Sequence, residues 1–183
     1  MNVEKLGLDG LILIELDVRT DQRGFFIERY NEGRFKAIGL PPFCQDNHSR
    51  SAPRTLRGLH YQVRPAQGKL VGVIRGAIWD VVVDIRPGSP TFGRTLSLEL
   101  NDRDGRVLWV PAGFAHGFCV LGSEAADVLY KVDTSYEPAT EGGILWSDPE
   151  LAIPWPVADP IISPKDQKLP AFARYRAEPP AWD

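Results

Sequence analysis

The chain has 183 residues, of which 43% are hydrophobic and 25% charged, and this suits one domain with a substantial core. Its 21 basic and 24 acidic residues give a net charge of −3, which argues against nucleic acid or an anionic membrane as a partner, although converging basic side chains could still bind a small anion. Two cysteines indicate no disulfide framework, and neither a signal peptide nor a transmembrane run is evident, so we expect a cytoplasmic protein.

Short β-type segments follow one another along the chain, separated by many of its 17 Gly and 16 Pro residues. One short helix is predicted over 31–39, with Asn31 as N-cap and Gly39 just past its end. The expected strands, in chain order, are 11–18, 24–30, 45–51, 69–75, 77–86, 95–100, 106–110, 117–121, 127–133 and 143–146. Regular short strands with Gly and Pro turns predict an all-β sandwich or barrel, formed by residues 1–183 as a single domain.

Polar residues share one face of several of these strands. Alternation over 45–51 places Gln45, Asn47 and Ser49 together, and His60 stands two residues before Gln62. Such a face either meets solvent or lines a ligand cavity inside a barrel. Amides and an imidazole are less typical of a free surface than Lys and Glu, which favours a cavity.

His60 is the histidine whose neighbours best suit catalysis. Arg57 precedes it by three residues and Lys69 follows by nine. A base beside cations suits abstraction of a proton next to a carbonyl, because the cation stabilises the enolate. The arrangement also requires a carboxylate to orient the imidazole. The alternative is that His60 is a packed or surface residue.

His116 lies in a P-x-G-x-x-H pattern over 111–116, which is typical of the second metal motif of cupins. The first motif needs a further histidine and a glutamate upstream, whereas the chain has only His60, Tyr61 and Gln62 there. Two histidines without a paired carboxylate make a poor metal site. We therefore expect no metal, and a metal-dependent cupin oxygenase remains the alternative.

Ten collinear segments resemble the dTDP-4-dehydrorhamnose 3,5-epimerase family and cover nearly the whole chain. They are DQRGFFIE (21–28), QDNHSRS (45–51), LRGLHYQ (56–62), QGKLV (67–71), DVVVD (80–84), SPTFG (89–93), PAGFAHGF (111–118), LYK (129–131), EGGILWSDP (141–149) and SPKD (163–166). The resemblance implies an all-β jelly-roll (cupin-like) barrel that forms a homodimer and uses no cofactor. It also implies conversion of dTDP-4-dehydro-6-deoxy-D-glucose, a dTDP-linked 4-keto-6-deoxy sugar, to dTDP-4-dehydro-β-L-rhamnose for dTDP-L-rhamnose biosynthesis.

The same resemblance assigns four catalytic residues. His60 matches the base and Asp166 its paired carboxylate, Lys69 matches the lysine at the enolate oxygen, and Tyr130 matches the general acid. Each also has a structural interpretation: Asp166 as an acidic first-turn residue in 163–166, Lys69 as a solvated strand-end lysine, and Tyr130 as a core aromatic. Epimerisation needs two proton-transfer groups on opposite faces of the sugar, which His60 and Tyr130 would supply.

Ten further residues match the substrate contacts of the family. They are Arg23, Phe26, Glu28, Gln45, Asn47, Arg57, His116, Tyr136, Glu141 and Lys165. Tyr136 matches the aromatic that stacks on thymine, and the basic members would supply the local positive charge that a diphosphate demands. In some relatives the 23–28 strand crosses the dimer interface, so it could serve the pocket of the partner.

Two other functions stay open. An epimerase acting only at C3 or only at C5 would keep the same fold and catalytic residues. A catalytically silent sugar-binding barrel would lack His60, Tyr130 or Asp166, and all three are present.

Overall fold

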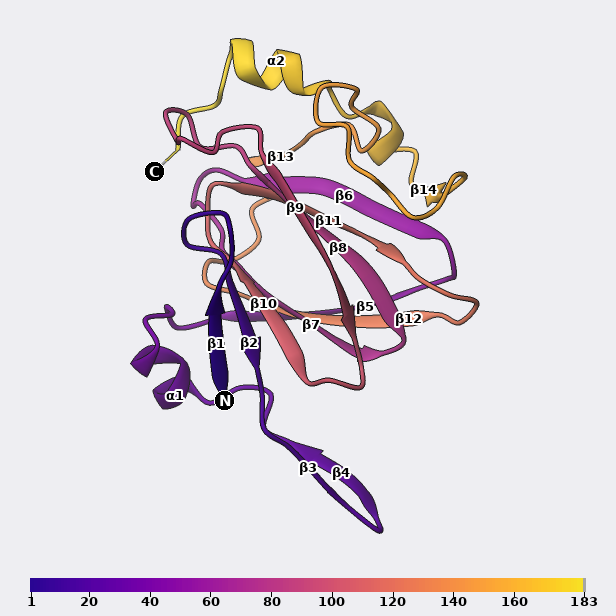
Figure 1. The fold of residues 1–183 in the computed structure, drawn as a ribbon. Coiled ribbons are helices and arrows are strands. Elements are labelled where there is room, and N and C mark those ends of the chain that lie inside the picture. Colours follow the sequence, from indigo (N-terminus) through magenta and orange to yellow (C-terminus); the bar gives the residue numbers. More distant parts are fainter. Residues whose placement is uncertain (183) are drawn as a thin grey trace.

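Two β-sheets face each other in the computed structural model, which describes residues 1–182 (Figure 1). The first sheet has the order β1-β2-β10-β7-β12-β5, and the second β13-β6-β11-β8-β9, with β14 paired to β6. The strands of the first sheet are β1 (Asn2–Lys5), β2 (Ile12–Glu15), β10 (Arg106–Val110), β7 (Lys69–Arg75), β12 (Ala126–Val132) and β5 (Gln45–Ser51). Those of the second are β13 (Glu141–Gly143), β6 (Thr55–Gln62), β11 (Phe114–Val120), β8 (Ala77–Asp84), β9 (Thr95–Asn101) and β14 (Ile161–Ile162).

The main core fills the space between the sheets. Leu108 and Val71 reach it from the first sheet and Val82 and Phe118 from the second. A second cluster covers the outer face of β8 beneath helix α2 (Phe172–Ala177), and a third packs helix α1 (Glu32–Ala37) against the first sheet. The facing sheets form the all-β jelly-roll (cupin-like) barrel that was predicted, with one end left open.

Several elements match their predicted bounds. Strands β5, β7 and β10 cover the predicted 45–51, 69–75 and 106–110. Helix α1 begins after Asn31, whose side chain accepts a hydrogen bond from the Arg34 backbone N–H at 3.2 Å. Gly39 follows its end with a φ of 88°, a conformation that favours glycine.

Four predicted strands were wrong in their extent, and β1 and β14 were not predicted. The run 117–121 belongs to β11, which begins earlier, at Phe114. The run 11–18 is two strands, because Leu16 turns out of the sheet to bond with Gly105 and β3 (Val18–Asp21) begins afterwards. The run 24–30 ends early, as β4 (Gly24–Ile27). Instead of 143–146, β13 pairs through 141–143, since the Leu145 N–H donates to Pro170 at 2.8 Å. Strand β6 itself was missed.

Strands β3 and β4 form a hairpin that projects from the body of the barrel (Figure 1). Phe25 and Phe26 near its tip are 62% and 66% exposed. None of the helices in residues 1–182 has the length and apolar character to cross a membrane.

Candidate active site

One pocket opens between the two sheets and gathers eleven of the fourteen predicted site residues, all except Arg23, Phe26 and Glu28. Strands β5, β7 and β12 form one wall and β6 and β11 the other. Gln45, Asn47 and Ser49 line it from alternate positions of β5, so the polar face of this strand faces a cavity as the alternation favoured.

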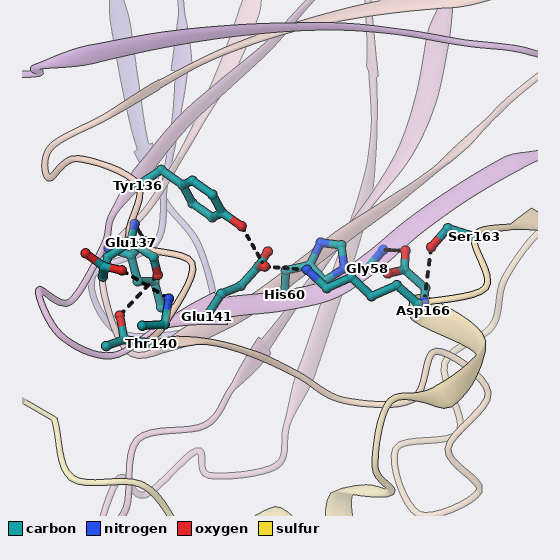
Figure 2. Close-up of polar contacts among 11 residues, drawn as sticks. Gly58, His60, Tyr136, Glu137, Thr140, Glu141, Ser163 and Asp166 are labelled. Carbon is teal, nitrogen blue, oxygen red and sulfur yellow. Dashed lines mark hydrogen bonds and ion pairs between the residues drawn. The ribbon is translucent and has the colours of Figure 1, made fainter.

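His60 and Asp166 form a hydrogen-bonded pair within the pocket (Figure 2). The Nε2 atom of His60 lies 2.8 Å from Oδ1 of Asp166. Burial raises the pKa of Asp166, but bonds from His60, the Gly58 N–H and Ser163 outweigh it and hold that pKa below its usual value. Asp166 is therefore ionised at neutral pH and can orient the imidazole and stabilise its protonated form.

Asp166 is an acidic residue in the first turn of a short helix and also lines the pocket. The Asp166 N–H donates to Ser163 Oγ at 3.0 Å, which starts the short 3₁₀ helix η1 (Asp166–Lys168). This turn lies against β6 at the edge of the pocket, so the same geometry that begins the helix delivers the carboxylate to His60.

Two glycines bring the histidine-bearing strands close together. Gly58 on β6 has a φ of 125°, and a Cβ there would lie 2.6 Å from the Cα of Gly117 on β11. His60 and His116 face each other in register across these strands. The absence of side chains at both glycines therefore permits the close backbone contact beside the two imidazoles.

Lys69 begins β7 and extends its amine into the pocket. Burial lowers its pKa to about 8, although the charges of Glu141 and Asp133 partly oppose this shift. It forms no ion pair with any side chain in residues 1–182. A desolvated cation without a fixed partner can stabilise a developing oxyanion more strongly than a solvated one.

Tyr130 stands on β12 opposite Asn47 and packs against the main core. Burial raises the pKa of its phenol, and the nearby Arg57 opposes this while Glu141 adds to it. The hydroxyl therefore stays protonated at neutral pH and can donate a proton. Tyr130 is thus both a core aromatic and a pocket residue.

His116 has a carboxylate partner that was missed in the sequence. Its Nε2 atom lies 2.8 Å from Oδ2 of Asp80, which is fully buried on β8. Each of the two imidazoles therefore has its own carboxylate: Asp166 for His60, as the resemblance implied, and Asp80 for His116, which was not identified from the sequence. The signal was the alternation of β8, which turns Asp80 away from Trp79 and Val81 and toward the barrel interior. Across residues 1–182, no three His, Cys, Asp or Glu side chains converge as a metal site would require.

Three predicted binding residues meet at the mouth of the pocket. The Tyr136 hydroxyl donates to Oε2 of Glu141 at 2.9 Å (Figure 2). The Lys165 ammonium bonds to the same oxygen. Burial raises the pKa of Glu141, but these two bonds outweigh it and lower that pKa overall. The Tyr136 N–H also donates to Gln45, whose amide donates to Asn47 at 2.9 Å.

Arg23, Phe26 and Glu28 lie away from this pocket, on or just after the β3–β4 hairpin. Arg23 forms an exposed ion pair with Asp21, and Glu28 accepts a bond from Arg34 at 3.0 Å. The hairpin therefore does not bring them to the pocket that holds His60 and Tyr130 of their own chain.

The pocket of this jelly-roll barrel combines a histidine–carboxylate pair with a buried lysine and a protonated tyrosine, groups that can accept, stabilise and donate a proton. The family match and the named relatives below place the protein among the isomerases, in the carbohydrate-epimerase class. Residues 5–174 match the model of the dTDP-4-dehydrorhamnose 3,5-epimerase family. The chain belongs to this family.

Individual relatives agree with this assignment. The chain is 52% identical over 176 residues to the dTDP-4-dehydrorhamnose 3,5-epimerase of Pseudomonas aeruginosa, covering 94% of this chain and 97% of that protein. The crystal structure of the Legionella pneumophila 3,5-epimerase, in complex with dTDP-4-keto-L-rhamnose, superposes with a TM-score of 0.93 at 43% identity and covers 100% of this chain and 98% of that one. A dTDP-4-dehydrorhamnose 3-epimerase of Streptomyces niveus is 42% identical, covering 96% of this chain and 86% of that protein.

Proposed function

We propose that the protein converts dTDP-4-dehydro-6-deoxy-D-glucose to dTDP-4-dehydro-β-L-rhamnose, by proton exchange at C3 and C5, in dTDP-L-rhamnose biosynthesis. The observation that carries this proposal is the hydrogen bond between His60 and Asp166, in one pocket with Lys69 and Tyr130. The Pseudomonas aeruginosa enzyme and the ligand of the Legionella pneumophila structure support the choice of sugar.

His60 removes the proton from the carbon beside the C4 ketone, and the electron pair of that C–H bond forms an enolate. Asp166 stabilises the resulting imidazolium, and the Lys69 ammonium stabilises the enolate oxygen. Tyr130 then donates its phenolic proton to the same carbon from the opposite face, which restores the ketone with inverted configuration. His60 then releases its proton to solvent and the Tyr130 phenolate takes one up from solvent, after which a second cycle inverts the other carbon.

The mouth of the pocket suits the nucleotide end of the substrate. Arg57 and Lys165 line it with positive charge, and Tyr136 offers a half-exposed ring on which thymine can stack. Gln45, Asn47, Glu141 and His116 add hydrogen-bonding groups to the same walls. These contacts fit a dTDP-linked sugar better than a free sugar, because they extend well beyond the catalytic residues.

The hairpin supports a homodimer as the working unit. Phe25 and Phe26 are exposed, and Arg23 and Glu28 lie outside their own pocket. In a homodimer the hairpin would cover its aromatic side chains against the partner and bring Arg23, Phe26 and Glu28 to the nucleotide bound there. The single-domain organisation over 1–183, the cytoplasmic location, and independence from nucleic acid and membrane belong to the same proposal.

The second candidate is epimerisation at C3 alone, which the 42% identity to the Streptomyces niveus 3-epimerase favours. Incubation with dTDP-4-dehydro-6-deoxy-D-glucose in deuterated water separates the two candidates. Deuterium at both C3 and C5 is the expected result, whereas deuterium at C3 alone would establish the 3-epimerase. Deuterium at neither carbon would show that the protein is not an epimerase of this sugar.

A further inference from the structure

Gln62 is a deeply buried amide in the wall of the pocket that none of the roles above uses. It ends β6, is 2% exposed, and lies in register opposite Glu141 of β13. Alternation along the strand turns it to the same side as His60, two residues earlier. An amide buried this completely costs free energy unless its polar atoms find partners.

All three partners of the Gln62 side chain are backbone groups. Its Nε2 donates to the carbonyl oxygens of Pro65 at 2.8 Å and Ser135 at 3.1 Å, and its Oε1 accepts from the Glu137 N–H at 2.8 Å. Two carbonyl partners on one side and an N–H on the other define the orientation of the amide without ambiguity. Both amide hydrogens are occupied, so Gln62 has none to offer to a substrate.

Gln62 forms hydrogen bonds to the backbone on both sides of Tyr136. Ser135 and Glu137 are its immediate neighbours, and one amide holds the carbonyl of the first and the N–H of the second. Tyr136 itself is 49% exposed, and within residues 1–182 its own hydrogen bonds are two: its N–H donates to Gln45 and its hydroxyl donates to Glu141. Because half of the Tyr136 side chain is exposed, the position of its ring depends largely on how the backbone of this residue is held.

We propose that Gln62 is a positioning residue that sets the affinity for the nucleotide through Tyr136. The buried amide holds the two peptide units flanking Tyr136, and this fixes the ring at the pocket mouth where a base would stack. Gln62 takes no part in proton transfer, although it lies on the same strand as His60. The inference rests on the proposed function, because it assigns Tyr136 to the nucleoside.

The test is Gln62→Leu, which keeps a similar volume and removes all three bonds. We expect a rise of about tenfold in KM for the dTDP-sugar, and in the Kd of thymidine diphosphate measured by calorimetry, with kcat changed by less than about twofold. If Gln62→Leu does not fold, the more flexible Gln62→Met provides the same measurement. An unchanged KM and Kd, or a loss confined to kcat, would overturn the proposal.

A control variant separates positioning from general loosening. Asn101 also holds a turn by its side-chain amide, accepting from the Arg103 N–H at 2.9 Å, but it lies on β9 outside the pocket. Asn101→Ala should lower the melting temperature without changing KM. If it raises KM as Gln62→Leu does, the effect is not specific to Tyr136.

A double-mutant cycle with Tyr136→Ala tests the route of the effect. If Gln62 acts through Tyr136, Gln62→Leu should add little to the KM or Kd of Tyr136→Ala, and the two changes should be strongly non-additive. Additive effects would contradict the proposal. The Kd of thymidine diphosphate keeps this test separate from the proposed reaction, because absence of deuterium exchange in the wild-type protein would refute only the epimerase function.

Discussion

The inner wall of the pocket and its mouth are built in different ways. His60, Lys69 and Tyr130 stand on the paired strands β6, β7 and β12, whose backbones are held by neighbours on both sides. At the mouth, Tyr136 lies in a loop and Lys165 before a short turn, and both bond to Glu141. The wall is held by backbone pairing between strands, whereas the mouth is held by hydrogen bonds that side chains make to one another and to the loop backbone.

This difference matches two tasks. Proton transfer depends on the positions of a few atoms, so its groups benefit from a rigid sheet. Binding a long nucleotide needs charge and an aromatic surface that the ligand can approach from solvent. We therefore expect changes in the wall to lower kcat and changes at the mouth to raise KM.

The strongest test at the wall is His60→Asn, which removes the proposed base and keeps a polar side chain. We expect kcat to fall about 10³-fold, with loss of deuterium incorporation at both carbons. His48→Asn is the matched control, because His48 lies half-exposed beside Asp127 on the outer face of β5. Substantial exchange in His60→Asn would transfer the role of base to another residue.

Tyr130→Phe separates the two proton transfers, because it removes the hydroxyl and keeps the ring in the core. We expect epimerisation to fall about 10²-fold, while His60 still exchanges the substrate proton for deuterium with retention of configuration. NMR analysis of the recovered sugar distinguishes exchange from inversion. Full epimerisation by this variant would rule out Tyr130 as the acid.

The pH dependence tests the charge of Lys69. Its pKa of about 8 means that the amine is protonated below that pH and neutral above it. Because kcat/KM reports the free enzyme, it should fall about tenfold per pH unit above this pKa. In Lys69→Arg this fall of kcat/KM at alkaline pH should disappear, whatever activity the variant retains. If the fall persists, a group other than Lys69 causes it.

Rising pH should lower activity through Lys69 but increase the contribution of Lys69 to the free energy of unfolding. Its pKa in the folded protein is about 8, below the value of 10.5 for an ordinary lysine, so the unfolded chain binds this proton more tightly. The contribution of Lys69 to folding therefore becomes more favourable as the pH rises from about 8 toward 10.5. Comparing the pH dependence of unfolding in the wild type and Lys69→Met isolates this contribution.

At the mouth, Lys165→Met should have the smallest effect. Losing one exposed cation should raise KM for the dTDP-sugar about five- to tenfold, with little change in kcat. Lys168→Met is the control, since Lys168 is an exposed lysine three residues further on, in the short helix η1, and does not line the pocket. If Lys165→Met lowers kcat alone, the proposed division between wall and mouth is wrong.

Local sequence patterns predicted the parts of the molecule that local physics determines. Alternation over 45–51 placed the amides of β5 on one face, and Asn31 and Gly39 bounded helix α1. The pairing of His60 with Asp166 spans 106 residues, and only the family resemblance suggested it.

Asp80 shows the limit of reading each strand alone. A carboxylate inside a run of valines looks like a misplaced surface residue until the neighbouring strand is known. His116 becomes its partner only through the pairing of β11 with β8. The hydrogen bonds of Gln62 to the residues on either side of Tyr136 could not be predicted from the sequence either, because Ser135 and Glu137 are remote from Gln62 in the chain.

The contact between Gly58 and Gly117 has a consequence for how such a protein can change over generations. A methyl group on Gly58 would meet the opposing backbone, so even the smallest side chain would push apart the strands that carry both imidazoles. At the mouth, Tyr136 and Lys165 extend instead from a loop and from the start of a short turn. A descendant could acquire a preference for another nucleotide by drift at the mouth, while the spacing of the two histidines would be inherited almost unaltered.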